Sequence, residues 1–230
     1  MKNFNTSISR RSLVASAFAG LGVVALGGLT ACGGSGTAAK GSAAAGSTTL
    51  TVAASPTPHA EILNDFAAPL LAKEGIELKV KEYTDYIQPN KDTTSGAVDA
   101  NYFQHITYLE NYNAENGTDL VSAGLIHYEP FAVYAGTSND LDAIADGATI
   151  AVPNDPTNEG RALLLLQDLG LITLSDPENL EATPKDVKDN PHNLKFQELE
   201  AAALPRALSS VDFAVINGNY AIEAGYHVAD

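Results

Sequence analysis

From residue 50 onward, short runs rich in β-branched and aromatic residues alternate with longer segments of helical character. This alternation is typical of α/β folds, in which helices cover a sheet. The predicted strands are 50–55, 76–83, 97–103, 131–137, 148–153, 194–200 and 212–217, and the predicted helices are 60–75, 105–117 and 160–170. Because ligands of α/β proteins bind beyond the carboxyl ends of strands, we expect a site in the loops that follow these strands.

The first residues have the composition of an export signal. Residues 1–11 carry Lys2, Arg10 and Arg11 and no acid, and residues 12–31 are uncharged. A basic start followed by an apolar stretch predicts a signal peptide. A permanent transmembrane anchor is the alternative, since the apolar stretch is just long enough to span a bilayer.

The sequence that follows, Leu29-Thr30-Ala31-Cys32-Gly33, resembles the lipobox of bacterial lipoproteins. This resemblance implies that residues 1–31 are removed and that the thiol of Cys32 carries a lipid. The pair Arg10-Arg11 also resembles a twin-arginine export signal. Residues 33–49 contain only Gly, Ser, Ala, Thr and one Lys, so residues 32–49 are predicted to be the lipidated end and a flexible tether.

Composition excludes several classes of function. There are 28 acidic and 13 basic residues, which argues against nucleic-acid binding. A single Cys rules out a disulfide within the chain and any Cys-based zinc or iron–sulfur site. No G-x-S-x-G motif is present, so no enzyme and no cofactor are predicted.

A metal site is not predicted either, because the five histidines lack H-x-H or H-E-x-x-H spacing. Convergence in space, as in zinc-capturing lipoproteins, remains the alternative for these histidines. They are His59, His105, His127, His192 and His227.

Residues 152–166 predict an anion site. A strand runs into a turn and then into a helix, with Asp155 as the expected cap and Pro156 as the first helical residue. Free N–H groups at the start of a helix favour an anion, and Arg161, about one turn into the helix, is placed to form bidentate hydrogen bonds with a carboxylate. The alternative is that Arg161 pairs with a neighbouring Asp or Glu.

Residues 99–109 predict an aromatic wall. If the strand continues to residue 105, Phe103 and His105 share one face, and Tyr108 returns to that side once a helix begins. Aromatic rings with one imidazole suit a polarizable side chain such as a thioether. The alternative is that Phe103 and Tyr108 are core residues.

Together these segments resemble the methionine-binding lipoproteins (NlpA type) that feed an ABC importer. The matching motifs, which occur in the family's order, are PTPHAEIL (56–63), DY-IQPN (85–90), DANYFQH-TYL (99–109), VPNDPTNEGRALLLLQ-LGLI (152–172), NPHNLKF-ELEAAALPRAL (190–208) and DFAVINGNYA (212–221). The resemblance implies a periplasmic-binding-protein-like fold of type 2, with two α/β lobes around a ligand cleft. The expected boundaries are 50–137 for lobe 1, 138–216 for lobe 2 and 217–230 for the start of a return into lobe 1.

The resemblance also implies residue roles. Arg161 is expected to bind the ligand carboxylate and Asn217 its amino and carboxylate end, with Asn158 and Tyr128 at the cleft edge. Tyr86, Phe103, His105 and Tyr108 are expected to surround the thioether. The implied ligand is L-methionine, with D-methionine or a methionine-containing dipeptide as alternatives.

The implied partners are the permease and ATPase of an ABC importer and the membrane, reached through the lipid on Cys32. The implied location is extracytoplasmic, and the protein is expected to be a monomer. Chains of this family continue beyond the position of Asp230 and supply a further cleft Asn, so the sequence is expected to be a fragment or a shortened protein. For a shortened chain, the alternative function is a surface antigen or adhesin with a vestigial cleft.

Overall fold

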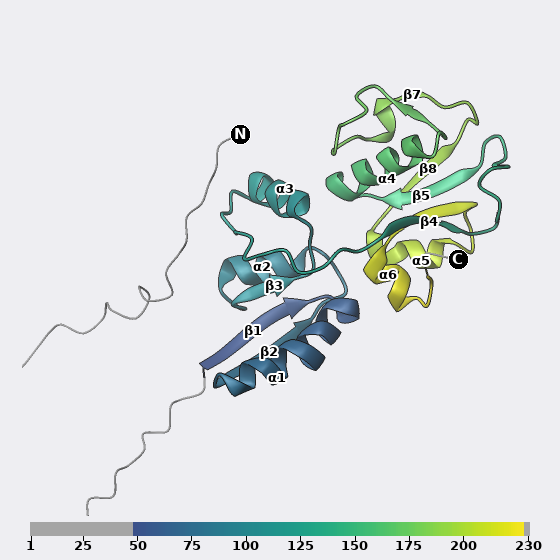
Figure 1. Cartoon of the computed structure of the whole chain (residues 1–230). Coiled ribbons are helices and arrows are strands. Elements are labelled where there is room, and N and C mark those ends of the chain that lie inside the picture. The colour runs from purple at the N-terminus through teal and green to yellow at the C-terminus, as the bar shows by residue number, and fades with distance from the viewer. Residues whose placement is uncertain (1–47, 228–230) are drawn as a thin grey trace, which may run out of the picture. The chain divides into compact units, whose positions relative to one another are not determined.

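The computed structural model describes residues 48–227, in which two principal β-sheets are flanked by helices (Figure 1). The expected signal peptide, Cys32 and nearly all of the expected tether lie outside the described residues. The last two residues of the expected tether instead begin the first strand, β1 (Thr48–Ala54). Within residues 48–227, no helix combines the length and the apolar character that crossing a bilayer requires.

The first sheet has the order β2-β1-β3, and both of its pairings are parallel. Its other strands are β2 (Ile76–Glu82) and β3 (Ala100–Tyr102). The connection from β1 to β2 is helical, with π-helical turns at Pro56–Ala60 and Leu63–Ala67 before α1 (Ala68–Lys73), which packs along β2. β3 is shorter than the predicted 97–103, because the N–H groups of Ala97 and Val98 bond to the carbonyl oxygen of Asp92, and contact with β1 begins only at Asp99, whose N–H bonds to Thr51.

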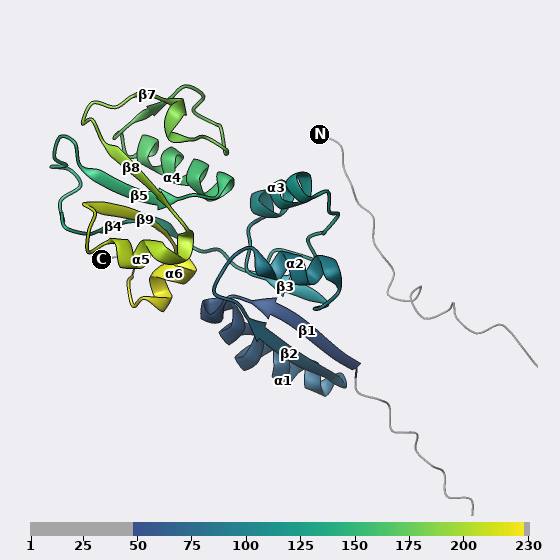
Figure 2. The same cartoon turned by 180° about the vertical axis from the view of Figure 1, so that it is seen from behind.

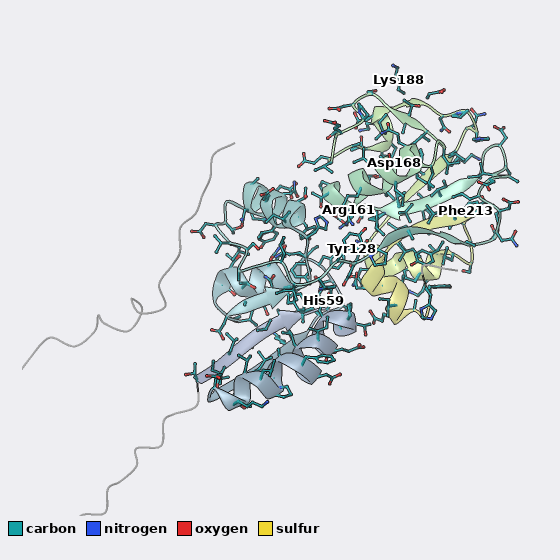
Figure 3. All side chains as sticks on the ribbon, viewed as in Figure 1. His59, Tyr128, Arg161, Asp168, Lys188 and Phe213 are labelled. Atoms are coloured by element: carbon teal, nitrogen blue, oxygen red, sulfur yellow. The ribbon has the colours of Figure 1, made fainter. Side chains whose placement is uncertain are left out.

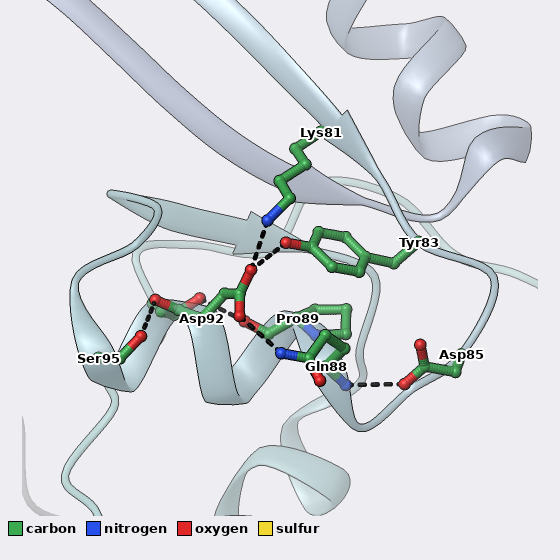
Figure 4. Close-up of polar contacts among 8 residues, drawn as sticks. Lys81, Tyr83, Asp85, Gln88, Pro89, Asp92 and Ser95 are labelled. Carbon is green, nitrogen blue, oxygen red and sulfur yellow. Dashed lines mark hydrogen bonds and ion pairs between the residues drawn. The ribbon is translucent and has the colours of Figure 1, made fainter.

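Helix α2 (Gln88–Ser95) was not among the predicted helices, and a polar network ties it to β2 (Figure 4). The carboxylate of Asp92 accepts hydrogen bonds from Lys81 Nζ at 2.7 Å, from Gln88 Nε2 at 2.7 Å and from the hydroxyl of Tyr83. These donors, Lys81 first, lower the pKa of Asp92 to about 2. The network fixes both ends of the loop that carries Tyr86.

Helix α3 (Ile106–Asn116) follows β3 and ends at Gly117, whose φ of 63° suits a left-handed cap. Residues 118–130 then form neither helix nor strand before the chain enters the second sheet.

The second sheet has the order β4-β9-β5-β8. β4 (Phe131–Ala135) runs antiparallel to β9 (Phe213–Asn217), while β5 (Thr149–Pro153) is parallel to both β9 and β8 (Lys195–Leu199). The predicted boundary at residue 137 is therefore wrong for β4, which belongs to the second sheet. A strand's own residues show that it is half-buried but do not name its partner, which is why the pattern did not place it.

Helices cover both faces of the second sheet, because successive side chains of a strand point to opposite sides. Ile150 and Val152 pack with α4 (Pro156–Asp168), whereas Ala151 packs with α5 (Leu204–Ala207). Figure 2 shows α4 on one side of this sheet and α5 on the other.

Smaller elements complete this part of the chain. They are β6 (Thr173–Leu174) paired with β7 (Val187–Asp189), the 3-10 turns Pro184–Asp186 and Ala201–Ala203, and α6 (Gly218–Glu223). α6 contacts both β9 and the turn Pro56–Ala60 that follows β1. The parallel strands and covering helices confirm the predicted α/β class.

Candidate functional site

A cavity of about 360 Å³ is lined by residues of the second sheet and by residues of the segments that follow the strands of both sheets. All eight residues predicted for the ligand site line it: Tyr86, Phe103, His105, Tyr108, Tyr128, Asn158, Arg161 and Asn217. Three of the contributing segments can be followed from His59, Tyr128 and Arg161 in Figure 3. The cavity has a polar end at the start of α4 and an aromatic end formed by residues that follow β2 and β3.

The polar end depends on how α4 begins. Asp155 is the cap, and its carboxylate accepts the N–H of Asn158 at 3.0 Å, while Pro156 is the first helical residue. Both predictions for this turn are confirmed. The helix also packs very closely against residues 180–181. A Cβ atom added to Gly160 would lie only 2.1 Å from the carbonyl oxygen of Leu180. Glycine therefore permits the packing that sets the position of the next residue, Arg161.

Asn158 is the centre of the polar end and is 1% exposed. Its Nδ2 donates to both carboxylate oxygens of Asp155, at 2.9 and 3.0 Å. Its Oδ1 accepts from Arg161 Nη1 at 2.7 Å and from Asn217 Nδ2 at 2.9 Å. The side chain of Asn158 was expected at the cleft edge. In the structure it is buried, and its Oδ1 accepts hydrogen bonds from both Arg161 and Asn217.

Arg161 forms no ion pair within residues 48–227, since no Asp or Glu oxygen there lies within 4.0 Å of its guanidinium. Its guanidinium carbon lies 4.5 Å from the ring centroid of Phe131, a cation–π contact. Burial lowers the pKa of Arg161 from its ordinary value, but an arginine at neutral pH stays protonated. Pairing with a neighbouring acid, the alternative interpretation of Arg161, is thus contradicted.

Asn217 leaves one polar atom at this end without a hydrogen-bond partner in residues 48–227. The Oδ1 of Asn217 is buried and makes no hydrogen bond to any of the described residues. A buried carbonyl oxygen without a donor costs free energy, so a bound group with N–H donors would stabilise it. The polar end therefore presents a cation and an acceptor, which match a carboxylate and an ammonium.

The aromatic end consists of three rings. The centroid of Tyr86 lies 5.8 Å from that of Phe103 and 6.1 Å from that of Tyr108, and the Phe103 and Tyr108 centroids are 5.9 Å apart. The hydroxyl of Tyr108 donates to the backbone oxygen of Tyr86 at 3.0 Å, which fixes the wall. Phe103 is 9% exposed, so it is buried like a core residue and also lines the cavity.

His105 joins the two ends. Its Nδ1 accepts the N–H of Tyr108 at 3.2 Å and so caps α3. The proton of the neutral ring must then lie on Nε2, which donates to Asn158 Oδ1 at 3.3 Å. Burial, followed by the nearby charge of Arg161, lowers the pKa of His105 to about 4, so the ring is neutral at pH 7.

Several cavity residues were not predicted, among them Phe131 beneath Arg161 and the rim residues His59, His127 and Glu129. Phe131 reads as an ordinary strand residue in the sequence, since its role depends on Arg161 thirty positions away. Tyr128 lines the cavity but is 89% exposed, which places it at the mouth. Burial, followed by the charge of His127, lowers the pKa of His59 to about 4.

Known proteins resemble this chain over most of its described length. The methionine-binding lipoprotein MetQ of Bacillus subtilis (strain 168) is 45% identical over 200 residues, which are 85% of this chain and 70% of the relative. The D-methionine-binding lipoprotein MetQ of Escherichia coli (strain K12) is 45% identical over 155 residues, 66% of this chain and 57% of the relative. The chain spans less than two thirds of the length of most of its first relatives.

Solved structures agree with the fold. A nutrient-binding protein from Burkholderia cenocepacia, whose structure is bound to methionine, matches with a TM-score of 0.75 and 43% identity. The match covers 79% of this chain and 76% of that protein. The predicted two-lobed substrate-binding fold is thus confirmed. The sequence profile of the NlpA lipoprotein family matches residues 50–230, and the chain therefore belongs to the NlpA lipoprotein family.

Proposed function

We propose that this protein is a lipid-anchored binding protein that captures methionine in the cavity and delivers it to an ABC importer. The observation that carries the proposal is that Arg161 has no acidic partner among the described residues and lines a partly aromatic cavity of about 360 Å³. Relatives named for methionine binding, one of them solved with methionine bound, support the choice of amino acid. A binding role also agrees with the prediction that the chain is not an enzyme.

In the proposed complex, the ligand carboxylate pairs with Arg161, and the ligand ammonium donates to the Oδ1 of Asn217. A buried zwitterion needs such fixed partners, because its charges lose their hydration on entering the cavity. The thioether lies among Tyr86, Phe103 and Tyr108, since sulfur makes favourable contacts with aromatic rings. Asn158 fixes the positions of the Arg161 and Asn217 side chains through its Oδ1, and its own Nδ2 is already hydrogen-bonded to Asp155.

L-methionine is the proposed enantiomer. D-methionine is its competitor in the test, because the E. coli relative is named for D-methionine. We further propose that lipid on Cys32 anchors the protein outside the cytoplasmic membrane and that a permease–ATPase complex accepts its ligand. The relatives are named as lipoproteins, and the lipobox-like sequence before Cys32 supports this anchoring.

The test is titration calorimetry of the full chain in detergent with L-methionine, D-methionine, alanine and glutamate. Arg161→Ala should abolish methionine binding, because it removes the cation that answers the carboxylate. Arg206→Ala is the matched control: it removes the other arginine beyond residue 31, which is exposed on α5. Unchanged methionine affinity in Arg161→Ala would refute the assigned role, and tighter binding of alanine or glutamate than of methionine would refute the ligand.

A further inference from the structure

Two histidines and a glutamate converge on the cavity wall, apart from the residues proposed to bind methionine. One ligand atom from each of His59, His127 and Glu129 can be chosen so that all three lie within 4.8 Å of one another. Glu129 Oε1 lies 2.7 Å from His127 Nε2 and 3.4 Å from His59 Nε2. The spacing of the histidines in the sequence gave no sign of this cluster, because His59 and His127 are far apart in the chain.

We propose that His59, His127 and Glu129 bind one zinc ion. Two imidazole nitrogens and one carboxylate oxygen form a donor set that zinc uses, with water in the fourth position. Calcium and magnesium prefer sites built from oxygen alone, so this set favours zinc over them. The proposal is independent of methionine binding.

Two of the three distances between the ligand atoms can be compared with a zinc site, and the third lies within 4.8 Å. Zinc–ligand bonds of about 2.0–2.1 Å in a tetrahedron place the ligand atoms about 3.3 Å apart. The 3.4 Å separation of Glu129 and His59 already has this value, and the 2.7 Å contact between Glu129 and His127 must open slightly. The His127 and Glu129 side chains are 24% and 22% exposed, so both have room to adjust.

The surroundings hold the two imidazoles in place. The ring of His59 is buried, and its centroid lies 4.7 Å from that of Tyr102 and 5.0 Å from that of His127, both edge to face. The hydroxyl of Tyr102 is hydrogen-bonded to Nδ1 of His127. When Nε2 of a histidine binds a metal, its Nδ1–H usually donates to an oxygen of this kind, which orients the ring.

A second observation marks His59 as incompletely satisfied. Its Nδ1 is buried and has no hydrogen-bond partner among residues 48–227. Its Nε2, by contrast, lies 3.4 Å from Oε1 of Glu129. His59 is therefore buried and held by aromatic contacts, and its Nε2 faces the partly exposed pair His127 and Glu129. It is already in position to be the first zinc ligand.

Zinc at this place would join two segments that are distant in sequence. His59 lies in the turn after β1, whereas His127 and Glu129 lie in residues 118–130, which form neither helix nor strand. Because the ion would bind only the folded arrangement, it would stabilise the protein and hold residues 118–130 against the first sheet. Zinc should therefore slow proteolysis within that segment.

The test is calorimetry of the full chain in detergent, stripped of metal with a chelator and titrated with ZnCl2 without methionine. Co2+ absorption in the visible region reports the coordination number. We expect one zinc per chain and at least about a hundredfold weaker binding in His127→Ala and in Glu129→Gln, since loss of a group that only orients a ligand already costs 10–100-fold. Tyr102→Phe should weaken zinc binding about tenfold.

Two histidine variants serve as controls. His192→Ala, outside the cavity, and His105→Ala, at the methionine end of the same cavity, should both keep the wild-type zinc affinity. The proposal is overturned if the wild type shows no saturable zinc binding, if His127→Ala and Glu129→Gln both bind zinc as the wild type does, or if His105→Ala abolishes binding. Methionine titrations of the same samples separate this outcome from failure of the transport proposal.

Discussion

Replacing Asn158 with alanine should destabilise the protein more than any exposed substitution nearby, because Asn158 connects four buried or half-buried partners. Its Oδ1 accepts from Arg161, Asn217 and His105, and its Nδ2 donates to Asp155. Alanine removes the side-chain amide but keeps the backbone N–H that Asp155 caps. The loss thus concerns the side-chain contacts and not the start of α4.

The size of the effect follows from the charges involved. Hydrogen bonds to charged groups contribute about 1.5–3 kcal/mol each, and those between neutral groups contribute about 1 kcal/mol. Two of the partners, Arg161 and Asp155, carry charge. Water entering from the cavity replaces part of the loss, so we expect the free energy of unfolding to fall by about 3–4 kcal/mol. This is a large share of the 5–15 kcal/mol typical of a folded protein.

Urea denaturation followed by circular dichroism measures the change. Asn154→Ala is the matched control, since Asn154 lies in the same strand–helix turn but is exposed. Its free energy of unfolding should stay within about 0.5 kcal/mol of the wild type. If Asn158→Ala also stays within about 1 kcal/mol, the four contacts do not act together and the organising role assigned to Asn158 is refuted.

Two further predictions concern packing and pH. Gly160→Ala should lower the free energy of unfolding by about 1–3 kcal/mol in the same urea assay, because its Cβ would overlap the carbonyl oxygen of Leu180; a neutral result would mean that α4 moves away freely. His105 has a folded pKa of about 4 against 6.5 in the unfolded chain, so its contribution to stability is complete above pH 6.5 and is lost as the pH falls to about 4. The difference in unfolding free energy between wild type and His105→Gln should therefore change by up to about 1.4 kcal/mol per pH unit across that window, and a constant difference would contradict the lowered pKa.

The strands with strong apolar character could be placed from sequence. The predicted runs 148–153 and 212–217 match β5 and β9 to within one residue, because both strands are buried on the two faces that α4 and α5 cover. Helix α2 was missed, since Gln88–Ser95 has no apolar periodicity and is held by the polar contacts of Asp92. Local pattern cannot report contacts of that kind.

In the candidate site, too, local features could be predicted from the sequence and long-range contacts could not. The turn Asp155–Pro156 carries a helix-start signal that is local, so its cap and first helical residue were predicted correctly. The contact between Asn158 and Asn217 joins residues 59 positions apart, and only the folded sheet brings them together. The resemblance supplied eight of the residues that line the cavity, but neither it nor the spacing indicated that Asn158 is the shared acceptor.

The aromatic end of the cavity also determines how the protein emits light. The chain has nine tyrosines and no tryptophan, so its intrinsic fluorescence comes from tyrosine alone. The ring centroid of Tyr86 lies 6.1 Å from that of Tyr108 and 5.0 Å from that of Tyr220, close enough for excitation to migrate among the three phenols. A molecule that enters between Tyr86 and Tyr108 should change both the intensity and the polarisation of that emission. Occupancy of the cavity can thus be followed optically in the unlabelled protein.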